Sequence, residues 1–302
     1  MSIESKIKTL QSKLTNGVSP AMATPLQADG HTVNETIVAQ LVDFLIEKGI
    51  SGLFVGGTTG EGLALAAEER MRLHEAALTA VNHRIPILLH VGANDSKTAV
   101  ALTKHAVQLN PEAIVAIPPT FFGMDDDSLA DYFHVIANAA PETPLFLYDI
   151  PHLAINGISP ALLGHLQQTL PTLAGVKTSR PDAQIIRQHI AVANGRLLVL
   201  AGNERIALGS LAMGADGLIS GLSTAVPEPF VALTQAVGRS DLAAARQAHQ
   251  LINQLLDLMP PRRIGGIKQI LAERGIAVGT AVPPRPMPEK PIWPHMQPLI
   301  ES

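Results

Sequence analysis

The sequence contains no cysteine. Disulfide bonds and thiolate metal sites are therefore excluded, and a reducing compartment is compatible with the chain. Basic residues are not in excess either, because 22 Lys and Arg stand against 26 Asp and Glu, for a formal net charge of −4. This balance lacks the basic footprint that marks a nucleic-acid-binding protein.

Long hydrophobic runs are also missing. No window approaches the roughly 18 uncharged apolar residues that a membrane helix needs. The first ten residues, MSIESKIKTL, lack the apolar centre of a secretory signal. We therefore expect a cytoplasmic protein that binds neither membranes nor nucleic acid. With 302 residues, 46% of them hydrophobic, the chain can bury a large core.

Eight short apolar runs alternate with longer amphipathic segments. The runs are almost continuously apolar, which is typical of parallel strands buried on both faces. They predict strands at Gly17–Ala23, Ser51–Gly57, Pro86–Gly92, Glu112–Pro118, Pro144–Ile150, Leu173–Lys177, Arg196–Gly202 and Asp216–Gly221. Eight such units predict a (β/α)8 barrel, the TIM barrel. A doubly wound open sheet is the alternative, which the regularity of the repeat disfavours.

The helices carry recognisable ends. The first opens with TVNE, which predicts Thr32 as the N-cap and Glu35 as its capping-box partner. Gly49 stands where a C′ glycine ends that helix. Further barrel helices fit Ala66–Asn82, Ser96–Leu109, Asp126–Ala139, Pro160–Leu170, Asp182–Ala193 and Glu204–Met213.

Additional C-terminal segments follow the barrel. Two helices fit Asp241–Leu258 and Ile264–Arg274. The last stretch, VPPRPMPEKPIWPHMQP, holds seven prolines and predicts an extended Pro-rich C-terminal arm. We expect residues 1–225 to form the catalytic barrel. Residues 226–302 should add the last barrel helix, the C-terminal helices and the tail to the same structural unit.

Ligands of such barrels bind at the C-terminal ends of the strands. Lys177 ends the run LAGVK, so its amine should lie at the barrel mouth between apolar walls. Burial disfavours an ammonium and lowers its pKa. A neutral amine can attack a ketone and form a Schiff base. The alternative is a lysine that ends a strand and extends into solvent.

Tyr148 ends the preceding strand and is one of two tyrosines in the chain. It should therefore stand beside Lys177, where a phenol could transfer protons. Taken alone, it is also consistent with an amphipathic aromatic at a strand end. The pair on neighbouring strands is a stronger indication of catalysis than either residue.

The stretch VGGTTGEG, Val55 to Gly62, is rich in small residues. Consecutive small residues after a strand can form a nest of N–H groups that binds an anion. Thr58 and Thr59 would offer N–H groups and hydroxyls to a carboxylate, while Gly57 and its neighbouring glycines keep the approach open. Glu61 should lie just outside and form a structural pair. A plain tight turn explains the glycines equally well.

Five motifs together resemble one family. GGTTGEG, YDIP, GVK, AGNE and GADGLISG occur in the order and spacing of the dihydrodipicolinate synthase / N-acetylneuraminate lyase family, over about Gly17 to Gly275. The resemblance implies (β/α)8 barrels that are usually homotetramers, built as dimers of dimers. It implies class I aldolases and lyases that join pyruvate to an aldehyde, or cleave the product, through a lysine Schiff base. No metal or organic cofactor is expected, because the iminium is itself the electron sink.

The resemblance also assigns roles to residues. Lys177 resembles the Schiff-base lysine and Tyr148 the tyrosine that transfers protons. Thr58 and Thr59 resemble the pair that holds the pyruvate carboxylate, and Thr59 is expected to contact the tyrosine hydroxyl. Two further residues should line the pyruvate site, Gly202 and Ile219.

The departures from the family concern the aldehyde. The synthases carry an arginine that grips the carboxylate of the aldehyde substrate, where this chain has Leu153. They also use a second tyrosine, lent by a neighbouring subunit, where this chain offers Phe121 and Phe122, which carry no proton. Asp149 replaces the usual asparagine after the catalytic tyrosine. The pyruvate half of the site is thus retained and the aldehyde half altered.

Arg180 and His152 could supply the missing anion contact, although both could equally be solvated surface residues. With Arg180 in that role, Phe121 and Phe122 would form an apolar wall of the substrate pocket. We expect an aldolase or lyase acting on a 2-keto-3-deoxy sugar acid or a similar 2-oxo acid. The alternatives are a dihydrodipicolinate synthase that condenses pyruvate with aspartate semialdehyde, and a non-catalytic barrel that binds keto acids.

Overall fold

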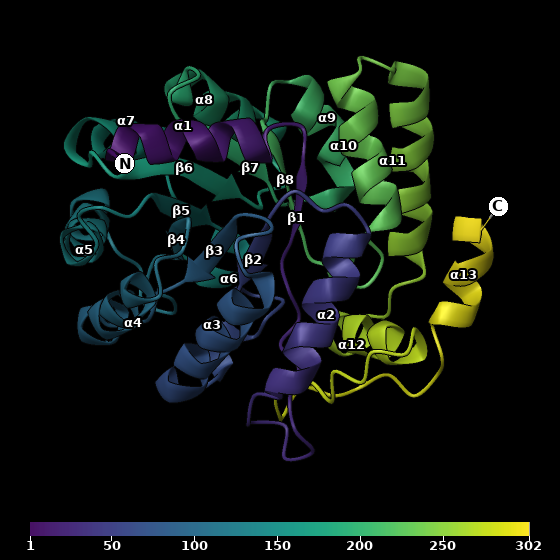
Figure 1. Ribbon diagram of the computed structural model, residues 1–302. Coiled ribbons are helices and arrows are strands. Elements are labelled where there is room, and N and C mark those ends of the chain that lie inside the picture. Colours follow the sequence, from purple (N-terminus) through teal and green to yellow (C-terminus); the bar gives the residue numbers. More distant parts are fainter. Residues whose placement is uncertain (302) are drawn as a thin grey trace.

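Parallel strands form a barrel in the computed structural model, which describes residues 1–301 (Figure 1). Each strand from β2 to β7 pairs with the next one in sequence, and β8 pairs with β1. A parallel bridge between Ala21 and Phe54 joins β1 to β2 and closes the seam. The predicted TIM barrel is confirmed. The described strands are β1 Val18–Pro20, β2 Leu53–Val55, β3 Ile87–His90, β4 Ala113–Ala116, β5 Leu145–Asp149, β6 Leu173–Thr178, β7 Leu198–Ala201 and β8 Gly217–Ser220.

A helix follows each strand, and the observed bounds lie close to those predicted. The helices around the barrel are α2 Glu35–Glu47, α3 Ala67–Val81, α4 Ser96–Gln108, α5 Asp126–Ala139, α7 Pro160–Thr169, α8 Ala183–Ala193, α9 Ala207–Ala212 and α10 Glu228–Gly238. The remaining ones are α1 Ile3–Leu14, α6 Pro151–Ala154, α11 Leu242–Asp257, α12 Arg263–Glu273 and α13 Trp293–Glu301. Among the described residues, no helix is long and apolar enough to cross a membrane.

The start of α2 differs from the prediction. Asn34, not Thr32, is the N-cap, and its side chain accepts the N–H of Ile37. The hydroxyl of Thr32 instead donates to Asp29 at 2.6 Å, so it is no longer available for the helix. The predicted end is confirmed, because Gly49 follows the C-cap with a φ of +81°.

Helix α1 closes the N-terminal end of the barrel. Its Leu10 and Leu14 are buried in the same apolar cluster as the inward-facing Phe54, Phe146 and Leu200. Figure 1 shows α1 lying across this end of the strands. The opposite end, where the strands finish, is therefore the one left for a ligand.

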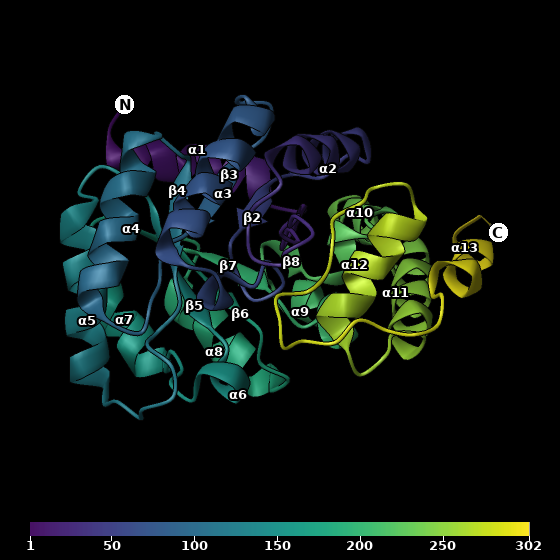
Figure 2. The ribbon, with the colours of Figure 1, turned by 90° about the horizontal axis from the view of Figure 1, so that it is seen from below.

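The C-terminal segment is only partly the predicted arm. Residues 276–292 have no regular structure and run past α12, as Figure 2 shows, but α13 is a helix despite Pro298 inside it. An interior proline costs a helix about 3 kcal/mol. Two features offset this cost: Glu273 accepts the N–H groups of Ile292 and Trp293, and Met296 is fully buried.

Candidate active site

Lys177 and Tyr148 stand side by side at the C-terminal end of the barrel. They are register partners on β6 and β5, as predicted. The lysine is only 3% exposed, and its Nζ lies 4.0 Å from the centroid of the Tyr148 ring and 4.6 Å from that of Phe54. Burial lowers the pKa of Lys177, against the opposing effect of Tyr148 and Glu204. The lowered pKa favours the neutral, nucleophilic form of the amine.

The hydroxyl of Tyr148 has a partner, but not the predicted one. Thr58 Oγ1 lies 3.1 Å from Tyr148 Oη, whereas the family resemblance implied this contact for Thr59. The hydroxyl of Thr59 lies near Gly221: a Cβ added to Gly221 would be 2.7 Å from Thr59 Oγ1. The bend of the loop separates two neighbouring hydroxyls, so Thr58 and Thr59 meet different sides of the cavity.

The glycines of the Thr58–Thr59 loop serve first to fold the loop on itself. A Cβ at Gly62 would lie 1.8 Å from the carbonyl oxygen of Gly56, and Gly56 has a φ of +75°. A Cβ at Gly57 would lie 2.3 Å from the ring of Phe54. A tight turn therefore explains these glycines. The same turn places Thr58 at the wall of the cavity.

Glu61 anchors this loop to the C-terminal segment. It is buried, and its carboxylate lies 3.0 Å from Nζ of Lys268, which is itself fully buried. Val282 donates its N–H to the same carboxylate at 2.9 Å, and Arg285 lies 3.5 Å away. The predicted structural pairing of Glu61 is present, and its partners follow it by more than 200 residues in the sequence.

Gly202 and Ile219, which the resemblance assigns to the pyruvate site, line the cavity that holds Lys177. A Cβ on Gly202 would lie 3.1 Å from Cε of Lys177 and 2.3 Å from the hydroxyl of Ser179. Glycine at this position leaves space for the lysine side chain. Ile219 is 1% exposed and contributes an apolar surface.

The cavity has a volume of about 380 Å³ and two chemically different halves. The inner half contains Thr58, Thr59, Tyr148 and Lys177. The outer half is formed by side chains from loops, from the short helix α6, from the 3-10 turn after β7 and from α12: His152, Leu153, Ser179, Pro181, Asn203, Glu204, Arg205, Arg263, Ile264 and Ile267.

Within residues 1–301, Arg180 does not line this cavity. Its predicted contact with the substrate is therefore wrong. Its Nε and Nη2 bind both oxygens of Asp149, at 2.7 and 3.1 Å. Asp149 is fully buried and also accepts from Thr178 and Ile158. The guanidinium therefore compensates a buried carboxylate instead of facing the substrate.

Phe121 and Phe122 do not form the predicted apolar wall either. They are 75% and 74% exposed and line a separate hollow with Asn94 and Thr120. His152 and Leu153, in contrast, do line the outer half of the catalytic cavity, with Leu153 58% exposed.

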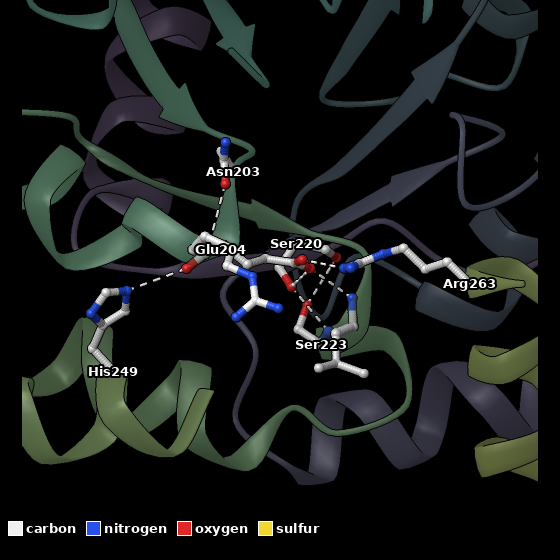
Figure 3. Close-up of polar contacts among 8 residues, drawn as sticks. Asn203, Glu204, Ser220, Ser223, His249 and Arg263 are labelled. Atoms are coloured by element: carbon white, nitrogen blue, oxygen red, sulfur yellow. Dashed lines mark hydrogen bonds and ion pairs between the residues drawn. The ribbon is translucent and has the colours of Figure 1, made fainter. Parts of the chain in front are cut away.

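The sequence pattern missed the Glu204–Arg263 pair. Glu204 accepts the hydroxyl of Ser220 and the N–H of Leu222, both at 2.8 Å, and pairs with Arg263 at the start of α12 (Figure 3). The motif AGNE contains Glu204, but nothing in the spacing connects it with an arginine 59 residues later. The pair fixes a guanidinium on the wall of the outer half.

Fold and site together define a lyase of the class I aldolase type, built on a (β/α)8 barrel. The chain belongs to the dihydrodipicolinate synthetase family, whose sequence model matches residues 14–294. The resemblance seen in the motifs is thereby confirmed.

Relatives within this family differ in substrate. The 4-hydroxy-tetrahydrodipicolinate synthase of Salinibacter ruber is 35% identical over 236 residues, which are 78% of each chain. The putative 2-dehydro-3-deoxy-D-gluconate aldolase YagE of Escherichia coli is 29% identical over 298 residues, 97% of this chain and 98% of that one.

Solved structures agree with this placement. A catalytic lysine mutant of the Ruminococcus gnavus sialic acid aldolase superposes with a TM-score of 0.90 at 26% identity, over 96% of this chain and 95% of that one. YagE in complex with pyruvate gives a TM-score of 0.87 at 28% identity, over 94% and 97% of the two chains.

Proposed function

We propose that the protein is a pyruvate-dependent class I aldolase or lyase acting on a 2-keto-3-deoxy sugar acid or a similar 2-oxo acid. One observation carries the proposal: the buried amine of Lys177 lies against Tyr148, whose hydroxyl is paired with Thr58. A nucleophile of lowered pKa next to a proton-transferring phenol is what Schiff-base chemistry needs.

In the proposed mechanism, Lys177 adds to the C2 carbonyl and loss of water gives an iminium. Backbone N–H groups and hydroxyls of Thr58 and Thr59 hold the substrate carboxylate. Tyr148 transfers the protons of these steps. Cleavage of the C3–C4 bond releases the aldehyde and leaves an enamine; protonation at C3 and hydrolysis then release pyruvate. No metal or organic cofactor takes part, because the iminium accepts the electron pair.

The outer half of the cavity supports an aldehyde with hydroxyl groups. Its cations are compensated, since Glu204 pairs with Arg263 and Asp257 pairs with Arg205. Asn203 adds an amide that can both donate and accept. A mixed set of donors and acceptors suits hydroxyls, each of which also donates and accepts, better than it suits a second free carboxylate.

Two other functions compete with this proposal. The 35% identity to a 4-hydroxy-tetrahydrodipicolinate synthase favours condensation of pyruvate with aspartate semialdehyde. Leu153 stands against it, because an apolar side chain at the mouth offers nothing to the aldehyde's carboxylate. A non-catalytic keto-acid-binding barrel is the third candidate, and the lowered pKa of Lys177 argues against that one.

We further propose a cytoplasmic homotetramer. Phe121, Phe122, Met124 and Val135 form an exposed apolar surface after β4, and contiguous apolar surfaces of this kind mark protein–protein contacts. A second copy of this chain is the partner we expect. Light scattering on the purified protein measures the assembly directly, and a monomer would contradict this part of the proposal.

Borohydride trapping tests the mechanism. The protein is incubated with pyruvate and borohydride, and the adduct is mapped by mass spectrometry. The expected result is one reduced pyruvate on Lys177. No adduct, or an adduct on another lysine, would contradict the proposal. A parallel screen of 2-oxo acids for pyruvate release identifies the aldehyde half.

A further inference from the structure

The short helix α6 carries two of the side chains that line the outer half of the catalytic cavity, His152 and Leu153. It has only four residues. A helix of this length is not stable through its own hydrogen bonds. The position of His152 and Leu153 at the mouth of the cavity therefore depends on the residues that flank α6.

The helix ends in a strained residue. Ile155 has a φ of +69° and a ψ of −54°, close to the rare and strained γ-turn of positive φ. For a β-branched residue such a φ is a genuine outlier. Ile155 is also 59% exposed, so packing of its own side chain does little to offset the cost. Contacts made by neighbouring residues must maintain this conformation.

Asn156, the next residue, makes such contacts with the loop after β4. It is buried, and its Nδ2 donates to the carbonyl oxygens of Pro119 and Phe122 at 2.7 and 2.8 Å. Its Oδ1 accepts the N–H of Met124 at 2.8 Å. Two acceptors face the amide nitrogen and one donor faces the amide oxygen, which determines the orientation of the amide. Both hydrogens of Nδ2 are used.

The loop that Asn156 binds is strained as well. Phe121 lies in sequence between the two residues whose carbonyls accept from Asn156, and its φ is +80°. Nine non-glycine residues have a positive φ within residues 1–301, and the only apolar ones among them are Phe121 and Ile155. Both adjoin the contacts of Asn156, which indicates that this side chain maintains both conformations.

Asn156 also provides the hydrogen bonds that tie this segment to the rest of the barrel. Apart from the turns of α6 itself, the side-chain and backbone hydrogen bonds of residues 151–157 within the described chain are those of Asn156. Beyond it, Ile158 donates its N–H to Asp149 at 2.8 Å, which fixes the chain again. Loss of the Asn156 amide should therefore release residues 151–157 and little else.

We propose that Asn156 is a positioning residue for substrate recognition. It holds the strained end of α6 against the loop after β4 and thereby fixes His152 and Leu153 at the mouth of the cavity. Without this amide, Ile155 relaxes to a negative φ and α6 moves away from the mouth. The inference rests on the Schiff-base function proposed above, but the lysine and tyrosine of the inner half lie on strands and do not depend on this contact.

Limited proteolysis tests the position of α6 without any substrate. Chymotrypsin cleaves after leucine where the backbone opens locally, and mass spectrometry maps the cut. We expect cleavage after Leu153 to be about tenfold faster in Asn156→Ala, the order of effect that backbone strain of this kind has on a population. Glycine adopts a positive φ without steric cost, so the double variant N156A/I155G should return towards the wild-type rate.

Steady-state kinetics tests whether this position matters for the substrate. With 2-dehydro-3-deoxy-D-gluconate as the probe, N156A should raise KM about tenfold and leave kcat and pyruvate trapping near the wild-type values. The double variant N156A/I155G should recover most of the KM. A purely structural asparagine would lower the melting temperature, leave KM unchanged and show no recovery with I155G. Asn156→Ser keeps one donor; it replaces N156A if that variant does not fold, and should give a smaller change in the same direction.

Asn94→Ala is the matched control. Asn94 binds the same loop, since its Oδ1 accepts the N–H and the hydroxyl of Thr120 at 2.9 and 2.7 Å, but it forms no hydrogen bond with α6 in the described chain. N94A should lower the melting temperature without changing KM or the cleavage after Leu153. Unchanged KM and cleavage in N156A, or no recovery in the double variant, would overturn the proposal. Absence of pyruvate trapping in the wild type would instead reject the proposed function, and proteolysis would still decide what holds α6.

Discussion

The two halves of the catalytic cavity are built in opposite ways. Lys177 and Tyr148 of the inner half are strand residues, almost fully buried, and the barrel backbone fixes their places, while Thr58 and Thr59 come from the loop after β2. The outer half is assembled from loops and from Arg263, a residue of α12 that follows the barrel. In the proposed function, strand residues would thus carry the Schiff-base chemistry, and the connecting segments with α12 would carry selectivity. The following predictions test this division.

The largest effect is expected at Lys177. Lys177→Arg should abolish pyruvate trapping and turnover, because a guanidinium stays protonated and cannot act as the nucleophile. In the wild type, the trapping rate should rise with pH and level off below the ordinary lysine pKa of 10.5, since the pKa of Lys177 is lowered and the neutral amine is the reactive form. A rate that still climbs through pH 10.5 would contradict the lowered pKa. Circular dichroism checks that the variant folds.

Tyr148→Phe should lower kcat by about 10²–10⁴-fold, the usual contribution of a general acid–base group. Thr58→Val should lower kcat in part, and Thr59→Val should do so less, because only Thr58 is paired with the phenol. Steady-state kinetics on the three variants decides this order. A larger kcat loss in Thr59→Val would show that the loop rearranges around substrate.

Arg263→Ala should act mainly on the outer half of the cavity. We expect KM for the full substrate to rise about 10–100-fold, corresponding to the roughly 1.5–3 kcal/mol of a charge-assisted hydrogen bond. Pyruvate trapping should remain normal. Arg180→Ala is the matched control: it should leave KM unchanged but lower the free energy of unfolding by about 1.5–3 kcal/mol, because Asp149 stays buried with less compensation. Denaturant titration measures this loss, and a KM effect in Arg180→Ala would return that residue to the substrate site.

The smallest effect concerns Leu153. Condensation with aspartate semialdehyde should be poor in the wild type, and Leu153→Arg should improve kcat/KM by about tenfold or less. A single exposed cation contributes little unless its surroundings orient it, and Leu153 is 58% exposed. If the wild-type kcat/KM for this condensation is as high as that of a dedicated synthase, the synthase alternative is favoured. Leu153→Met controls for the change in size.

The sequence was informative where backbone periodicity determines position. Alternating runs predicted all eight described strands and thus the pairing of Tyr148 with Lys177. The sequence did not predict which of several nearby partners a side chain contacts. Whether Thr58 or Thr59 faces the phenol depends on the bend of one loop, and Arg180 was taken for a free cation because its acceptor, Asp149, is 31 residues away.

The C-terminal segment shows a different limit. Its prolines predicted an extended arm, but local propensity could not reveal that Glu273 caps the start of α13. Likewise, Glu61 in the glycine-rich motif gave no sign of a buried partner at Lys268. Both contacts join segments distant in sequence, and a single sequence records no such pairing.

The ion pair between Glu61 and Lys268 has a consequence for the order of synthesis. A ribosome exposes the Thr58–Thr59 loop long before it makes the cation that neutralises the buried carboxylate of Glu61, and later still Val282, which donates to the same group. A buried carboxylate without its partner is strongly unfavourable. The nascent barrel can therefore form its strands early, but the Thr58–Thr59 loop becomes complete only after Lys268 and Val282 have been made.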